Sequence, residues 1–170
     1  MGELLKVEDL RVSYHSYAGE VQSVRGVSFA VDERETLAIV GESGCGKSVT
    51  ARSIMGLIQT PPGEVKEGSH IWYKGKDILK YEEKEWRAYR GAECSIIFQD
   101  ALTSLNPTIK VGRQVAENLL LHQNMDKGQA WAEAERMLGL VGIPNPGKRM
   151  HQYPHEFSGG QRQRIAIARI

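Results

Sequence analysis

One short segment, residues 41–48, constrains what this chain can fold into more than any other. The segment reads G-E-S-G-C-G-K-S, which matches the pattern GxxxxGK followed by Ser or Thr at every fixed position. A nearly continuous apolar run at 35–40 precedes it, as expected for a strand buried on both faces, and helical spacing of apolar residues follows at 47–58. Because this pattern binds phosphate between a strand and a helix, the segment predicts an α/β fold built around a phosphate-binding loop.

The residue types in this loop suit a phosphate group carried with a metal ion. Glycines let the backbone curl so that several N–H groups face one anion, and the positive end of the following helix adds to the attraction. Lys47 supplies charge for the β- and γ-phosphates, and the Ser48 hydroxyl is placed to bind Mg²⁺, which prefers oxygen. The predicted nucleotide contacts here are Gly41, Glu42, Ser43, Gly44, Cys45, Gly46, Lys47, Ser48 and Val49.

Composition narrows the classes of protein that this chain can be. The net charge of +1 gives no field for non-specific binding to nucleic acid or to an acidic membrane surface. Cys45 and Cys94 lie far apart and outside any CxxC pair, so neither a structural disulfide nor a zinc site is supported, and a reduced cytosolic protein is expected. Cys45 either is a small residue that fits the loop or is a thiolate favoured by the helix start.

Other targeting and metal-binding signals are weak. No apolar signal core opens the chain and no apolar run is long enough to cross a bilayer, so we expect any membrane role to come through a partner. His151 and His155 are spaced i, i+4, but Pro154 lies between them, so they are predicted to be loop residues rather than a helical metal pair.

Local patterns predict the remaining elements. Strands are expected at 4–14, with a turn near Glu8 and Asp9, and at 21–31, 70–73 and 94–98. Helices are expected at 82–90, 111–123 and 127–141. The order is a β-rich part, then the phosphate-loop unit, then an α-rich part.

A second glycine-rich segment, F-S-G-G-Q-R-Q at 157–163, lies near the end of the chain. Ser158 followed three residues later by Gln161 is a capping box, which alone explains a helix start. F-S-G-G-Q also resembles the LSGGQ signature of ATP-binding-cassette (ABC) ATPases, with Phe157 where that family usually has Leu. In that family the segment of one subunit clamps the γ-phosphate bound by the other. The resemblance implies ATP contacts from Ser158, Gly159, Gly160 and Gln161, whose N–H groups and hydroxyl suit an anion.

The resemblance covers essentially the whole chain. I-I-F-Q-D at 96–100 matches the family's Q-loop, in which Gln99 would touch Mg²⁺ or the attacking water. An aromatic residue before the phosphate loop usually stacks on adenine; Tyr14 is the candidate and Tyr17 the alternative, although either could be an ordinary tyrosine. The implied cofactors are ATP and Mg²⁺, with Lys47 and Gln99 as catalytic residues and Ser48 and Gln99 at the metal.

The resemblance implies a P-loop NTPase (ABC ATPase) core. We expect a mostly parallel sheet around the loop strand, an N-terminal antiparallel β portion and a helical subdomain. The expected boundaries are 1–100 for the β portion and core, 101–157 for the helical subdomain, and 158–170 for the signature and the start of the next helix.

Three stretches are similar to importers of dipeptides, oligopeptides and nickel within that family. They are Q-D-A-L-T-S-L-N-P at 99–107, G-E-S-G at 41–44 and H-Q-Y-P-H-E-F at 151–157. The resemblance implies a bacterial or archaeal importer, with its ATPase subunits at the cytoplasmic face of the membrane. The partners implied are two permeases docked on the helical subdomain, a second ATPase subunit (itself or a paralogue) in a head-to-tail dimer, and indirectly an external solute-binding protein.

The chain also departs from the family pattern. The family continues beyond the signature helix with a strand ending in Asp and Glu, and later a switch histidine, and none of these occurs up to Ile170. We therefore expect a core that lacks its C-terminal part and a 170-residue chain that hydrolyses ATP poorly, although its intact parent would be an ATPase.

Three alternatives stay open at this point. A soluble ABC ATPase acting on DNA is opposed by the near-neutral charge and by the importer-like stretch at 104–107. A small P-loop kinase or GTPase is opposed by F-S-G-G-Q. A non-catalytic nucleotide-binding fragment would bind MgATP without turnover.

Overall fold

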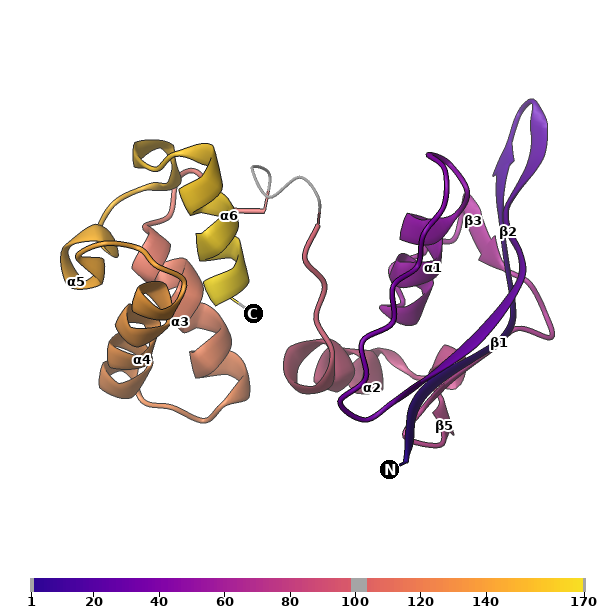
Figure 1. Cartoon of the computed structure of the whole chain (residues 1–170), viewed down its shortest axis with the longest axis horizontal. Helices are drawn as coiled ribbons and strands as arrows, with labels where there is room; N and C mark the ends of the chain where they lie inside the picture. The colour runs from indigo at the N-terminus through magenta and orange to yellow at the C-terminus, as the bar shows by residue number, and fades with distance from the viewer. Residues whose placement is uncertain (1, 99–103, 170) are drawn as a thin grey trace. The chain divides into compact units, whose positions relative to one another are not determined.

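The computed structural model describes residues 2–98 and 104–169. The chain divides into two compact units, Met1–Arg90 and Gly91–Ile170 (Figure 1). The first unit is built on an antiparallel sheet and the second is helical, and each is described by itself below.

The first unit holds a five-stranded sheet in which β1 pairs with three neighbours. The path runs β2-β1-β4-β5, β3 also pairs with β1, and every pair is antiparallel. Figure 1 shows β1 and β2 as one long hairpin with α1 beside it. The strands are β1 (Glu3–Ser16), β2 (Gly19–Asp32), β3 (Gly63–Val65), β4 (His70–Tyr73) and β5 (Lys76–Asp77).

The long strand β1 bends at Asp9 instead of turning there, which corrects the turn predicted near Glu8 and Asp9. Asp9 has φ +44, and the pairing register with β2 shifts between Val7 and Leu10. A strict period of two would put Val7 and Leu10 on opposite faces, but the bulge returns both to the core, where they are 1% and 0% exposed. The strand therefore continues to Ser16, and its register with β2 shifts again between Val12 and Ser13, which are both buried.

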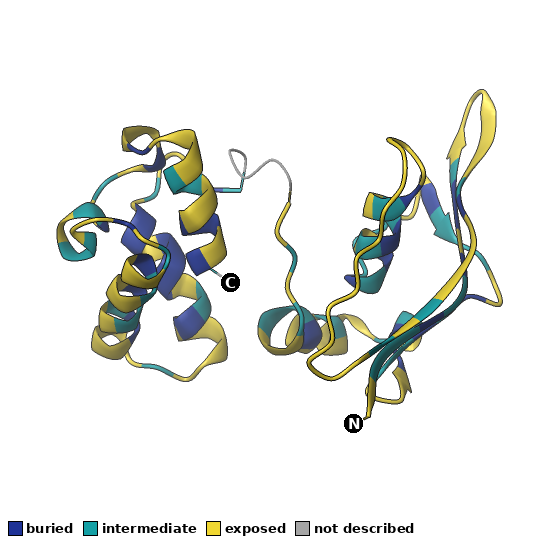
Figure 2. Ribbon diagram, viewed as in Figure 1, coloured by how far each residue is buried: buried dark blue, intermediate teal, exposed yellow. Residues whose placement is uncertain are grey.

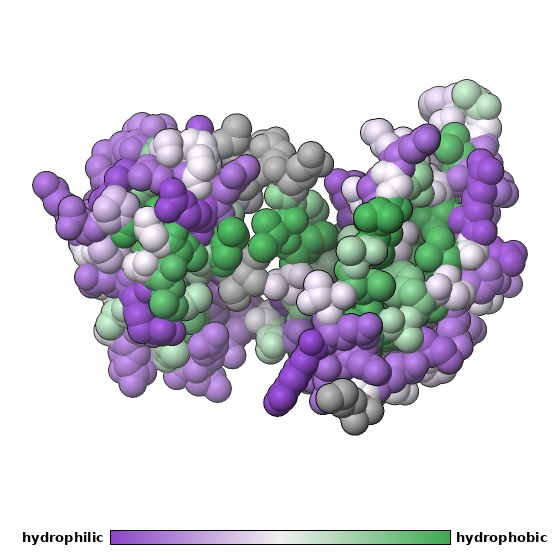
Figure 3. Space-filling view, in the orientation of Figure 1, coloured by the Kyte–Doolittle hydropathy of each residue, from purple (hydrophilic) through white to green (hydrophobic). Residues whose placement is uncertain are grey.

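Two predicted strands, 35–40 and 94–98, are not formed, and neither is the parallel sheet expected around them. Both segments lack regular structure, and no pairing among the described strands involves them. A parallel strand is stable only when ladder partners flank it and both faces are covered. Without them Val40 is 87% exposed, and Figure 3 shows apolar atoms at the surface of the first unit. Apolar sequence alone cannot form a strand without a partner.

Helical elements complete the first unit, and the last of them crosses its boundary at Arg90. The predicted helix at 47–58 ends earlier, because Gly56 adopts φ +60 and the N–H groups of Gly56 and Leu57 donate to Ser53 O and Arg52 O, at 3.0 and 2.8 Å. Trp86 packs where a Gly56 side chain would lie. The elements are α1 (Lys47–Ile54), the 3₁₀ turn η1 (Ile78–Lys80) and α2 (Glu83–Ala88), followed by a π-helical turn η2 (Tyr89–Glu93).

The second unit is a helical cluster around one core. The predicted helices at 111–123, 127–141 and after Ser158 are present, and the capping box is confirmed. Figure 2 shows the buried residues on the sides of the helices that face one another. Its elements are α3 (Val111–His122), α4 (Lys127–Leu140), α5 (Pro146–Arg149), the 3₁₀ turn η3 (Pro154–Glu156) and α6 (Gly159–Ala168).

The start of α3 is tied to the segment that leads into α6. The N–H groups of Val111 and Gly112 donate to Gln152 O and Met150 O, at 2.9 and 2.8 Å. A side chain at Gly112 would meet Met150 at 2.8 Å, so glycine is what allows this approach. None of the helices in the described part of the chain is long and apolar enough to span a bilayer.

Candidate functional site

The loop at 41–48 is curled around the side chain of its own lysine. Lys47 Nζ donates to Gly41 O at 2.7 Å and to Glu42 O at 2.6 Å, and it lies 3.5 Å from Cys45 Sγ. A lysine that reaches back over five and six residues holds the two ends of the loop together. The loop therefore has a curved backbone with a positive charge at its centre before any ligand is considered.

Two glycines in the loop have backbone angles that disfavour side chains. Gly44 has φ +81 and open space around the position of a Cβ. Gly46 has φ +94, and a Cβ there would collide with the carbonyl oxygen of Ser23 in β2. Gly46 is thus required for both conformation and close packing, whereas Gly44 is required for conformation alone.

Helix α1 begins with its N–H groups uncapped. Gly46 is the N-cap and supplies no side-chain acceptor, and the first turn holds no acidic residue. The Thr50 hydroxyl instead donates backwards to Gly46 O at 3.1 Å. The positive end of α1 is left for an anion, and an open glycine-lined turn with Lys47 at its centre fits a phosphate group.

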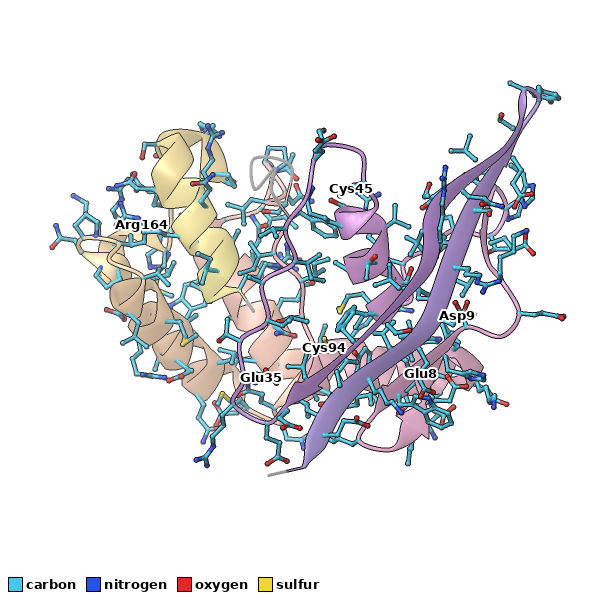
Figure 4. All side chains as sticks on the ribbon, turned by 45° about the vertical axis from the view of Figure 1, so that its right-hand side comes forward. Glu8, Asp9, Glu35, Cys45, Cys94 and Arg164 are labelled. Carbon is cyan, nitrogen blue, oxygen red and sulfur yellow. The ribbon has the colours of Figure 1, made fainter. Side chains whose placement is uncertain are left out.

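The remaining loop residues lie at the surface. Glu42, Ser43, Cys45 and Ser48 are exposed, and Val49 is half-buried. Figure 4 labels Cys45 at the turn that leads into α1. The exposed Ser48 hydroxyl is an oxygen ligand of the kind that Mg²⁺ prefers, next to the place where a phosphate fits. No group of three His, Cys, Asp or Glu residues in the described ranges could hold a metal by itself.

Three further residues were predicted to contact Mg²⁺ or the adenine ring: Gln99, Tyr14 and Tyr17. Gln99 lies outside the described residues. Tyr14, near the end of β1, is half-buried, and a Cβ on Gly63 would stand 3.1 Å from its ring. Tyr17, in the turn between β1 and β2, is fully exposed. The stacking role of either ring stays a prediction.

The signature segment lies in the second unit. Ser158 Oγ accepts from Gln161 N at 3.3 Å, and Gln161 Oε1 accepts from Ser158 N at 3.1 Å. Gly159 and Gly160 are exposed, with nothing within 4 Å of a Cβ at either position. Phe157, by contrast, is only 4% exposed and belongs to the helical core. A buried anchor thus holds an open helix start that can accept an anion.

The two histidines before this segment contact aromatic rings. The His151 ring lies 5.5 Å from the Trp131 ring, and the His155 ring stacks on that of Tyr153 at 5.7 Å. His151 is in a turn and His155 is in η3. They do not share an α-helix.

Ser23 is the loop neighbour that sequence reasoning did not single out. Its backbone carbonyl faces Gly46 from β2, about twenty residues away along the chain. No local signal marks such a residue, because the contact uses a main-chain atom and depends on how β2 packs against the loop.

Comparison with known proteins agrees with the motifs. The ABC transporter family model matches residues 24–170. The chain is 56% identical over 165 residues to the oligopeptide transport ATP-binding protein OppD of Bacillus subtilis, which covers 97% of the chain and 46% of that protein. It is 55% identical over 168 residues to the dipeptide transport ATP-binding protein DppD of the same organism, covering 99% and 50%. The chain spans about half the length of these curated relatives.

Solved structures agree on the fold. A dimeric ATP-binding cassette, MJ0796, bound to ADP and Pi superposes with a TM-score of 0.84 at 22% identity, covering 98% of the chain and 68% of that structure. CbiO1 from Clostridium perfringens, part of an ABC transporter complex, gives 0.75 at 24% identity, covering 99% and 61%. The α/β fold class expected from the sequence is confirmed, although the described strands include only its antiparallel portion.

Proposed function

This chain belongs to the ABC transporter family, and on that premise we propose that it is part of a subunit that couples MgATP binding and hydrolysis to the import of dipeptides or oligopeptides. The observation that carries the proposal is the curled loop with Lys47 Nζ at its centre and the uncapped start of α1 beside it. The names of the peptide-transport relatives support the choice of solute.

We assign the nucleotide contacts as follows. Lys47 exchanges its loop carbonyls for the β- and γ-phosphate oxygens, and the N–H groups of Gly44 to Val49 surround the phosphates. Ser48 and Gln99 would hold Mg²⁺, which would supply positive charge against the charge that develops on the phosphates. Tyr14 or Tyr17 stacks on the adenine.

The signature segment acts on the partner subunit's nucleotide. Because Ser158, Gly159 and Gly160 form an exposed helix start, a second ATPase subunit can present its bound γ-phosphate to them. The dimeric state of MJ0796 supports pairing of two ATPase subunits, and we propose that the pair is arranged head to tail. We further propose that residues 101–157 dock on permeases at the cytoplasmic face of the membrane and meet the solute-binding protein only through them.

The test uses the full-length protein that carries this sequence, assembled with its permeases. Lys47→Ala should abolish both ATP hydrolysis and peptide uptake, because the loop loses its only lysine. Lys84→Ala, on the exposed surface of α2, is the matched control and should leave both unchanged. Equal ATP turnover in the wild type and Lys47→Ala would contradict the nucleotide role, whereas ATP turnover that no peptide stimulates would contradict the choice of solute.

A further inference from the structure

The side chain of Arg149, the last residue of α5, contacts the signature segment. Its Nη2 lies 3.3 Å from Gln161 Oε1 and 3.5 Å from Glu156 O, and its Nε donates to Gln152 Oε1 at 3.1 Å. Its Cζ stands 4.5 Å from the centre of the Phe157 ring. One half-buried guanidinium thus contacts residues on both sides of Ser158.

The base from which Arg149 reaches is fixed. Pro146 sets the first turn of α5, Met150 N donates to Pro146 O at 2.8 Å, and the Met150 side chain is 1% exposed in the helical core. The carbonyls of Met150 and Gln152 accept from the first turn of α3. Because the helical core holds the backbone beside Arg149, its side chain can fix the position of the groups that it contacts.

The contacts of Arg149 are selective. It approaches the capping oxygen of Gln161 and the ring that anchors the segment. Among the described residues, no hydrogen bond or ion pair joins it to Ser158 Oγ, Gly159 or Gly160, which are exposed. Gln161 Oε1 accepts from both Ser158 N and Arg149. The guanidinium therefore restrains the capping box without occupying the anion site.

We propose that Arg149 is a positioning residue that holds Ser158–Gln161 in the conformation that receives the partner subunit's γ-phosphate. It acts by stacking on Phe157 and bridging Glu156 O to Gln161. Phe157 stands where the LSGGQ signature usually has Leu. Because an aromatic ring attracts a guanidinium and an aliphatic side chain does not, Phe157 can bind Arg149 in a way that Leu could not. The proposal rests on the function proposed above.

The experiment joins two measurements on the full-length protein, with Arg149→Ala and Arg149→Lys as variants. Hydrogen exchange of the nucleotide-free protein measures how well the amides of the signature segment are protected. ATP hydrolysis by the assembled transporter measures the effect of the segment on kcat, and the nucleotide Kd is measured separately. Arg136→Ala is the matched control, because Arg136 is an exposed arginine of the same unit that pairs with Glu133 at 2.6 Å.

In Arg149→Ala we expect the amides of Ser158 and Gln161, which the capping box protects, to exchange about tenfold faster, since the Nη2 hydrogen bonds to Gln161 Oε1 and Glu156 O are lost, while the amides of residues 165–168 are unchanged. The kcat for ATP hydrolysis should fall about tenfold with the nucleotide Kd within about twofold, because the loop at 41–48 is untouched. Arg149→Lys keeps the charge but not the planar fork, so it should recover only part of each effect.

Unchanged exchange at Ser158 and Gln161 in both variants would overturn the inference whatever the activity. So would an Arg149→Lys variant identical to wild type in exchange and kcat, which also covers the case in which Arg149→Ala fails to fold. Faster exchange throughout α6 with a raised nucleotide Kd would show a general loss of structure, and that too would overturn it. A wild type that turns over no ATP would instead overturn the proposed function, and the inference with it.

Discussion

The glycines of the phosphate loop offer the sharpest test of the geometry described above. Alanine at Gly46 must adopt φ +94, which costs about 1–2 kcal/mol, and its Cβ must also displace the Ser23 carbonyl, which costs about 1–3 kcal/mol more. The lower entropy of the unfolded chain offsets about 0.4–1 kcal/mol. We therefore expect Gly46→Ala to lose about 3 kcal/mol of unfolding free energy, within a range of about 1–5 kcal/mol.

Alanine at two other glycines tests the cost of backbone strain without a steric clash. Gly44 and Gly68 have φ +81 and +82 with nothing within 4 Å of a Cβ, so alanine at either should cost only about 1 kcal/mol. Gly44 lies in the loop and Gly68 lies outside it. Urea unfolding measures all three variants, and binding of a fluorescent ATP analogue should weaken in Gly46→Ala and Gly44→Ala but not in Gly68→Ala. A Gly46→Ala protein as stable as Gly68→Ala would refute the role given to the Ser23 contact.

Three further predictions concern other parts of the chain. Burial raises the pKa of Asp77, but hydrogen bonds from His70 and its other donors outweigh burial and hold that pKa below its ordinary value. The ionised Asp77 carboxylate therefore stabilises the fold above about pH 4, and this stabilisation is lost as the pH falls through the lowered pKa. Asp77→Asn should cost about 1–3 kcal/mol of unfolding free energy at pH 7 and flatten the acid limb of a pH–stability curve. Leu138→Ala, at a site 0% exposed, should cost about 2–5 kcal/mol in thermal unfolding, whereas Leu140→Ala on the same helix, 67% exposed, should change stability by less than about 0.5 kcal/mol. Ser158→Ala removes the N-cap of α6 and should cost about 1 kcal/mol, seen as a lower urea midpoint.

Local signals predicted the parts of the fold that depend on nearby residues. The capping box at Ser158 and Gln161 and the helices α3 and α4 follow from spacing over one or two turns, and these were confirmed. The strand at His70–Tyr73 was also confirmed. Each needs little more than its own residues and one apolar face to be recognised.

Features that depend on distant partners could not be predicted in the same way. The apolar run at 35–40 has the composition of a buried strand, yet it stays unpaired because no described strand runs beside it. The bulge at Asp9 depends on a register with β2 that no alternation pattern encodes. For the site, Lys47 and Ser48 were predicted from the motif, but the inward turn of Lys47 onto its own loop and the Ser23 contact are properties of the folded chain.

The inward turn of Lys47 also bears on what happens after a ligand leaves. A cation without acceptors beside the positive end of α1 would be repelled by it, but the carbonyl oxygens of Gly41 and Glu42 take up the charge. Departure of a phosphate is then a change of partners for one flexible side chain rather than a collapse of the loop. In the ATPase proposed above, Lys47 would pass between these carbonyl oxygens and the phosphate oxygens at every turnover, so its charge would have acceptors throughout.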